Sequence, residues 1–464
     1  GITILENNSI NELHKDELKN ILEARTYADA ERAVFKFPRK QKDNKYTNFF
    51  RNFKSFYEKL LHYQESHLDV LANGFLSKCQ IIEIKSWQIE QAITMFNSLN
   101  STGMPLSDAD IISAHLFSHA SNKDEFKGIW EPIIQSADKL AQNKIINIDN
   151  VLQQFMYINR SKERQYSEGE LTTPGVRKYY TVLYPELLET PDTLCDKFSK
   201  ILRIWDKIQS YSIVKLMMKF NENFKLFLIS YLFRIPENEI TESNITPIVE
   251  CLLRLFALLE VGDYSYSSRY FKTFLFNENF KLVDEAYKIE GILEDFNKHI
   301  SSTWKEEDVL TDLMEYDKNI LVYLNEYLYA KEHKIPFDFT PEKVNVEHIM
   351  PASGHNIESV RVNANLSKEE FEDLVNLLGN KILLEEDINK HIGMDWFQTK
   401  KGTLVQDKKG YVGSSFGIAS ALSSYPSNLW QKQDIEAANE KAATRICRFI
   451  FNKPLRDKVE NMIE

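Results

Sequence analysis

The residues best suited to chemistry in this sequence lie between positions 344 and 391. A short run over 344–348, rich in β-branched residues, ends in Glu347 and His348, and Pro351 then takes the chain out of regular strand pairing. Consecutive side chains on a straight strand point to opposite faces. Both side chains would therefore reach one metal ion only where the strand bends, and Pro351 favours a bend here.

Two asparagines follow in positions that suit the same site. Asn380 comes just before a second short apolar strand, and Asn389 lies nine residues further on, near the start of a predicted helix. This order of strand, strand and helix, with His348 ahead of the two asparagines, resembles the HNH nuclease motif. The resemblance implies two strands and a helix that together hold one divalent ion.

The resemblance is strongest to the HNH domain of the GmrSD family, the type IV, modification-dependent restriction enzymes. In that family the motif extends further, with an Asn followed at a fixed spacing by a Phe and two lysines. Asn389, Phe397, Lys400 and Lys401 of this chain have a similar spacing. A second segment, 96–110, is similar to the second signature of the ParB-like NTPase domain that precedes the nuclease in the same family.

The resemblance implies a role for each residue of the motif. His348, as a neutral imidazole, would take the proton from an attacking water, and Asn380 would orient that imidazole or its strand. Asn389 and Glu347 would hold Mg²⁺ or Mn²⁺, since hard oxygen donors favour these ions over zinc. The alternative for His348 is a core histidine capped by backbone groups. His391 is either a further ligand or a solvated helix residue.

Lysines concentrate around the end of this motif. Between positions 388 and 411 five lysines face two aspartates, a local charge of +3 in a chain whose net charge is −11. Such a patch can contact DNA phosphates, and the alternative is an ordinary solvated face. The five are Lys390, Lys400, Lys401, Lys408 and Lys409.

A candidate nucleotide site lies in the N-terminal quarter of the chain. Asn100, Ser101 and Gly103 form a predicted turn, and small donors before a helix N-terminus can hold phosphate oxygens. Ser107 and Asp110 have the spacing of a capping box that opens the next helix. The alternative is a structural turn between two helices, and the physical argument without the family resemblance favours this alternative. The leading signature of the NTPase domain, an Asp-Gly-Gln-Gln-Arg type motif, is absent, so binding of GTP or ATP depends on that motif existing elsewhere in the protein.

Composition excludes several classes of protein. The net charge of −11 argues against a protein that coats nucleic acid through its overall charge. The four cysteines lie far apart, which excludes a disulfide framework and favours a reducing cytoplasm. Apolar runs fall short of the ~18 residues that span a bilayer, so we expect no membrane partner. The chain lacks an initiating Met, and we expect it to be trimmed or part of a longer protein.

Helical spacing of apolar residues predominates along the chain. We expect a mainly α fold, with helical N-terminal and middle regions and a C-terminal ββα-metal (HNH) nuclease domain. The expected domains are 1–124, the C-terminal part of a ParB-like NTPase or sensor domain; 125–335, a helical bundle; and 336–464, the nuclease with a C-terminal helix. A single strand is expected at 80–85. The aromatic residues of 264–276 are expected in the core, with a base-stacking wall as the alternative.

These observations predict a divalent-metal-dependent DNA endonuclease of a bacterial restriction or antiphage system, acting on modified DNA. One HNH site cuts one strand, so double-strand cleavage would need a homodimer or two successive nicks. The alternatives are a catalytically silent sensor of DNA modification and a nucleotide-gated scaffold that acts with a partner.

Overall fold

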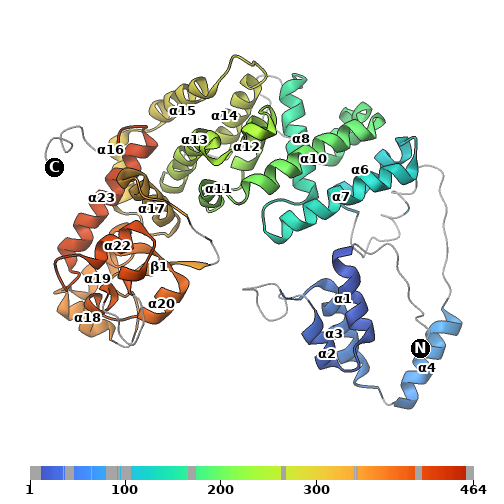
Figure 1. The fold of residues 1–464 in the computed structure, drawn as a ribbon, viewed down its shortest axis with the longest axis horizontal. Helices are drawn as coiled ribbons and strands as arrows, with labels where there is room; N and C mark the ends of the chain where they lie inside the picture. The colour runs from blue at the N-terminus through green and yellow to red at the C-terminus, as the bar shows by residue number, and fades with distance from the viewer. Residues whose placement is uncertain are drawn as a thin grey trace. The chain divides into compact units, whose positions relative to one another are not determined.

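The computed structural model describes residues 12–34, 36, 46–63, 65–79, 91, 95, 106–165, 174–262, 268–338, 340, 343–354, 356–402 and 410–455 (Figure 1). The chain divides into two compact units, one of residues 1–139 with 188–191 and one of residues 140–187 with 192–464. The three domain ranges expected from the sequence stay a prediction, and the strand expected at 80–85 lies outside the described residues.

The first unit is helical, and its first three helices share a small core of aliphatic and aromatic residues. Ile21, Ala30, Val34, Tyr46 and Phe50 are buried together, because the apolar stripes of three short helices converge on them. The capping box predicted for Ser107 and Asp110 is confirmed: each side chain accepts from the backbone N–H of the other at the start of a helix. The helices of this part of the chain are α1 (Glu12–Glu23), α2 (Tyr27–Ala33), α3 (Asn48–Leu60), α4 (Glu65–Lys78), α6 (Asp108–His119) and α7 (Lys123–Gln142), the last of which ends in the second unit.

The second unit begins with a bundle of helices around a dry core. Helix α12 is apolar on nearly every face, and most of residues 248–258 of α13 are buried, as expected for segments that neighbours surround. Phe271 and Phe276 are buried, which confirms the core prediction for them, whereas Tyr270 is exposed. The helices are α8 (Ile148–Lys162), α9 (Val176–Lys178), η1 (Tyr179–Leu183), η2 (Pro185–Glu189), α10 (Pro191–Ile208), α11 (Ser212–Met217), α12 (Phe224–Phe233), η3 (Glu237–Glu239), α13 (Glu242–Val261), α14 (Ser268–Lys281), α15 (Ile289–Thr303), α16 (Glu306–Met314) and α17 (Ile320–His333).

A two-stranded antiparallel sheet with short helices follows in the same unit. Strand β1 pairs with β2 so that Val344 faces Glu385 and His348 faces Lys381. The chain is thus mainly α, as predicted, with this small sheet near its C-terminus. The elements are β1 (Val344–His348), α18 (Ile357–Asn363), α19 (Lys368–Leu374), η5 (Leu378–Asn380), β2 (Lys381–Glu385), α20 (Glu386–Ile392), α21 (Phe397–Lys401), η6 (Tyr411–Gly413), α22 (Gly417–Ser423) and α23 (Lys432–Ile450).

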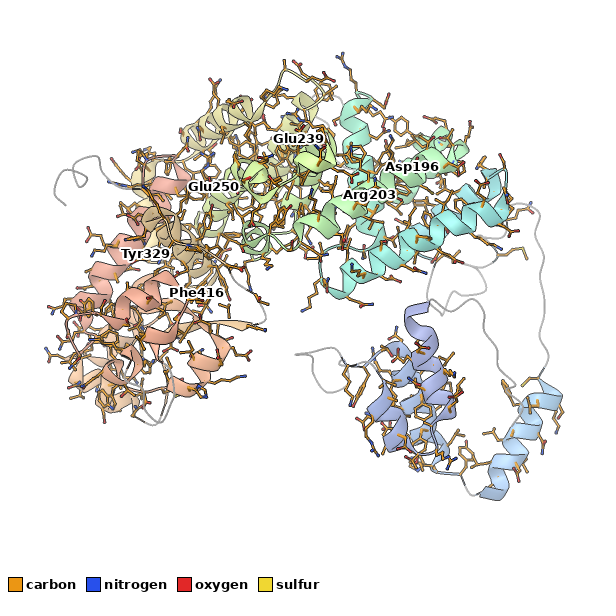
Figure 2. The ribbon with its side chains drawn as sticks, viewed as in Figure 1. Asp196, Arg203, Glu239, Glu250, Tyr329 and Phe416 are labelled. Atoms are coloured by element: carbon orange, nitrogen blue, oxygen red, sulfur yellow. The ribbon has the colours of Figure 1, made fainter. Side chains whose placement is uncertain are left out.

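Helices α17 and α22 hold the sheet against the rest of the unit. Both helices pack on β2, and they also pack on each other. Figure 2 labels Tyr329 of α17 and Phe416, the residue that precedes α22. Glu326 of α17 is buried, and its carboxylate accepts from the backbone N–H groups of Gly417 and Ile418 at the start of α22. Burial raises the pKa of Glu326 to about 7, against the effect of these hydrogen bonds.

Helix α23 fixes the start of β2 through a close backbone contact. The side chain of Asn439, which is buried, accepts from the N–H of Gly379 at 3.1 Å and donates to the carbonyl of Met314 at 2.8 Å. A Cβ atom at position 379 would lie 2.2 Å from the carbonyl oxygen of Ile435 and 2.4 Å from the nitrogen of Asn439. Position 379 therefore requires glycine for lack of space.

We predict that Gly379→Ala destabilises the second unit, because neither backbone atom of α23 can move away without disrupting the helix. Overpacking of this kind costs roughly 1–3 kcal/mol of unfolding free energy. The measurement is urea denaturation followed by circular dichroism. Gly175→Ala is the control, since a Cβ atom there meets nothing within 4 Å. Equal stability of the two variants would contradict the prediction.

Candidate active site

His348 ends β1 and is half-buried. Its Nε2 atom lies 3.3 Å from the side-chain oxygen of Asn376. With this amide orientation Nε2 donates to Asn376, and a neutral ring then has its lone pair on Nδ1. Burial lowers the pKa of His348, and the positive charges of Lys381 and Lys400 act in the same direction. These effects favour the neutral imidazole, which is the form that can accept a proton.

Asn380 holds the backbone just beyond His348. Its side chain is fully buried; Oδ1 accepts from the N–H of Met350 at 2.8 Å, and Nδ2 donates to the carbonyls of Met350 and Val375 at 2.9 and 2.8 Å. Its own carbonyl accepts from the N–H of Ile349 at 2.9 Å. Asn380 thus orders the strand end, while Asn376 contacts the ring.

Asn376 was missed by sequence reasoning. It lies four residues before Asn380, in the turn that leads to η5, and no strand or helix pattern marks it. The sequence offered one clue to its role, which is that Asn376 is an amide residue five positions before the start of β2. The pairing of β1 with β2 brings it to the imidazole, because His348 faces the first residue of β2.

Glu347 points to different partners from its neighbour. Its carboxylate is buried and forms an ion pair with Lys400, whose side chain is only 1% exposed. Tyr411 donates its hydroxyl to Oε1 of Glu347 at 3.4 Å, and Lys400 also donates to the carbonyl of His348 at 2.8 Å. Burial raises the pKa of Glu347 and lowers the pKa of Lys400, and the attraction between the two charges opposes both shifts.

This ion pair bears on metal binding. A divalent cation on Glu347 would lie beside the ammonium of Lys400, so the carboxylate does not fit as a ligand in this arrangement. Asn389 is a half-buried oxygen donor on α20, which packs against both strands. Across the described ranges no group of three or more His, Cys, Asp and Glu side chains could hold a metal ion. Within the described residues, these side chains thus supply only part of a metal centre.

The predicted lysine patch separates into different environments. Lys390 is exposed on α20 and lies 2.8 Å from the carboxylate of Glu386. Lys401 donates to the carbonyls of Tyr425 and Ser427, and Lys400 is the buried partner of Glu347. Among these three, Lys390 alone has an exposed side chain, and its contact with a phosphate stays a prediction. Lys408 and Lys409 lie outside the described residues, as do Asn100, Ser101 and Gly103 of the candidate nucleotide site.

His391 lies on α20 with its side chain exposed. Each helix within the described ranges is too short or too polar to cross a lipid bilayer.

Two protein-family models match the chain. The N-terminal domain of GmrSD restriction endonucleases matches residues 2–117, and the C-terminal domain of the same endonucleases matches residues 268–444. The second range includes His348, both strands and α20. Neither the curated proteins nor the solved structures gave a match.

We predict that Lys400→Met lowers the unfolding free energy by about 3–5 kcal/mol, because it leaves the Glu347 carboxylate buried without its counter-charge. Adding Glu347→Gln should recover part of that loss. Urea denaturation of the two single variants and the double variant measures the coupling. Lys390→Met is the matched control, since its exposed ion pair contributes at most about 0.5 kcal/mol. A loss for Lys400→Met as small as the control's would contradict the buried pair.

We also predict that His348 titrates below the ordinary histidine pKa of about 6.5. Lys381→Met should raise the pKa of His348, because it removes a nearby positive charge that disfavours the imidazolium. The ¹³C-histidine NMR signals, assigned with His348→Ala, report this titration. Lys390→Met, whose lysine does not contribute to the shift, should leave it unchanged. A wild-type pKa at or above the ordinary value would refute the assignment.

Proposed function

Because this chain belongs to the GmrSD restriction endonuclease family, we propose that its segment 344–392 is the ββα-metal (HNH) centre of a nuclease. Family membership implies a DNA endonuclease of a restriction system. Our proposal adds the location of the centre, its residues and its dependence on a divalent ion.

The observation that carries the proposal is the environment of His348. The imidazole of His348, whose pKa burial lowers, lies at the end of β1 with Nε2 3.3 Å from Asn376, and α20 follows β2 directly and packs on both strands. The order of strand, strand and helix is the order that the motif requires. The backbone next to the imidazole is held by Asn380 and Lys400, so the ring has a defined position.

In this proposal His348 takes the proton from the water that attacks a phosphodiester, and Asn376 keeps the ring in the tautomer that exposes Nδ1. Mg²⁺ or Mn²⁺, when bound, would polarise the phosphate and stabilise the leaving oxygen. Asn389 is the oxygen donor that we assign to that ion. A ligand role for Glu347 requires its ion pair with Lys400 to open, and no step depends on it.

The substrate that we propose is modified DNA in an antiphage system of type IV. The region of residues 2–117 would sense the modification or couple GTP or ATP binding to cleavage. Cleavage of both strands would come from a homodimer or from two successive nicks.

A second candidate function is a catalytically silent sensor of DNA modification. The observation that favours it is the buried pair of Glu347 and Lys400, which occupies the carboxylate that a metal ion would use. Such a protein would bind DNA without a metal ion and leave it intact.

We predict that the wild-type chain converts supercoiled plasmid to nicked circles with Mg²⁺ or Mn²⁺ and that EDTA abolishes the reaction. His348→Ala should slow it by about 10²–10⁴-fold, the usual contribution of a general base. His62→Ala, at an exposed position of the first unit, is the control and should cut like wild type. Plain and modified plasmids are compared with and without GTP or ATP.

Equal background cutting by wild type and His348→Ala on every plasmid would overturn the nuclease assignment. If the protein then shifts modified DNA in EDTA, the sensor function is supported instead.

A further inference from the structure

A cleft of about 850 Å³ begins one residue beyond His348. Residues 349–351 form part of its wall, and the remainder comes from α18, the start of α21 and the segment 428–431. Its volume is in the range of small-molecule sites. The wall of the cleft thus begins at the residue that follows His348 in the chain.

The wall combines aromatic surfaces with neutral amides. Trp396 and Trp430 line the cleft, and Trp396 is 38% exposed, so its ring is accessible from solvent. Asn363, Gln398 and Asn428 add side chains that donate and accept. This chemistry suits a flat, uncharged ligand with polar edges.

The charge of the wall argues against a phosphate as the ligand. Glu358 is the ionisable residue of the wall, and its carboxylate pairs with Arg361 at 2.8 Å. Within the described lining the cleft contains no lysine or arginine. Arg361 and Lys401 lie beside the wall, but Glu358 engages the first and the carbonyls of Tyr425 and Ser427 engage the second. A phosphate group would have to compete for them, whereas a neutral heterocycle needs no counter-charge.

Trp430 supplies a second, independent observation. The residue is 6% exposed, and its ring lies 5.3 Å from those of Phe397 and Tyr425, measured between centroids. Its Nε1–H is buried and has no hydrogen-bond partner within the described part of the chain. Buried donors are almost always satisfied, so this one calls for an acceptor beyond the described residues.

We propose that this cleft receives one nucleobase extruded from the DNA duplex. The base would stack on the tryptophan surface, its edge would meet the amides, and a ring nitrogen or carbonyl oxygen would accept from Nε1 of Trp430. The inference rests on the proposed function, because it takes DNA as the substrate. It adds that the enzyme reads a base outside the helix.

The test relies on the free-energy cost of extruding a base from the duplex. A mismatched base leaves the stack more easily than a paired one, so a protein that binds an extruded base prefers a mismatched duplex. The full chain carrying His348→Ala is titrated with two labelled duplexes, one fully paired and one with a single central mismatch, and fluorescence anisotropy measures both affinities. We expect roughly tenfold tighter binding of the mismatched duplex.

Trp430→Phe keeps an aromatic ring and removes the N–H together with the five-membered ring, and it should reduce this preference to less than about threefold. Its melting temperature is measured alongside, and both affinities are determined at a temperature where the variant is fully folded. Trp304→Phe makes the same change on a tryptophan outside the cleft and should keep the preference. Loss of the preference in Trp430→Phe alone supports the inference. An unchanged preference in that variant overturns it.

Plasmid cleavage by the wild-type chain is measured in parallel. It tests the nuclease activity separately from the base-binding cleft, whose inference rests on that activity. Cleavage with equal affinity for both duplexes overturns the base-binding cleft and leaves the nuclease intact. If the protein neither cleaves the plasmid nor binds either duplex, both the base-binding cleft and the nuclease assignment are overturned.

Discussion

The buried ion pair of Glu347 and Lys400 is the interaction on which the candidate site depends. Lys400 reaches from α21 to the carboxylate of Glu347 and to the carbonyls of His348 and Ile349, so one ammonium group fixes three consecutive residues of the strand end. Two charges in a dry interior are tolerated only while each satisfies the other. The position of His348 therefore depends on a residue that lies far from it in sequence.

The helical scaffold completes this arrangement. Glu326 of α17 caps α22, and Asn439 of α23 joins the turn before β2 to the end of α16. A two-stranded sheet is marginal on its own, because it buries little apolar surface. Here α17 and α22 pack on β2, and α20 covers both strands, so the helices supply the stability that the sheet lacks. The small nuclease-like element and the bundle thus belong to one compact unit.

The two strands and the helix of the motif were predictable because their signals are local. The β-branched run before His348, the apolar run after Asn380 and the capping box of Ser107 with Asp110 each involve neighbours in sequence. The burial of Phe271 and Phe276 followed from helical spacing in the same way. Phe397, Lys400 and Lys401 were also visible in the sequence, although their surroundings in the fold were not.

The sequence by itself determined the residue types of the site, their order and the family that carries them. The tertiary structure alone decided which charges meet. Lys400 was expected at a DNA phosphate and lies instead against Glu347, because burial depends on how α21 packs and not on the lysine's neighbours in sequence. Asn376 reaches His348 through strand register, and Trp430 lines a cleft formed by segments far apart in the chain. Local patterns encode elements, whereas contacts between elements arise only when the whole chain folds.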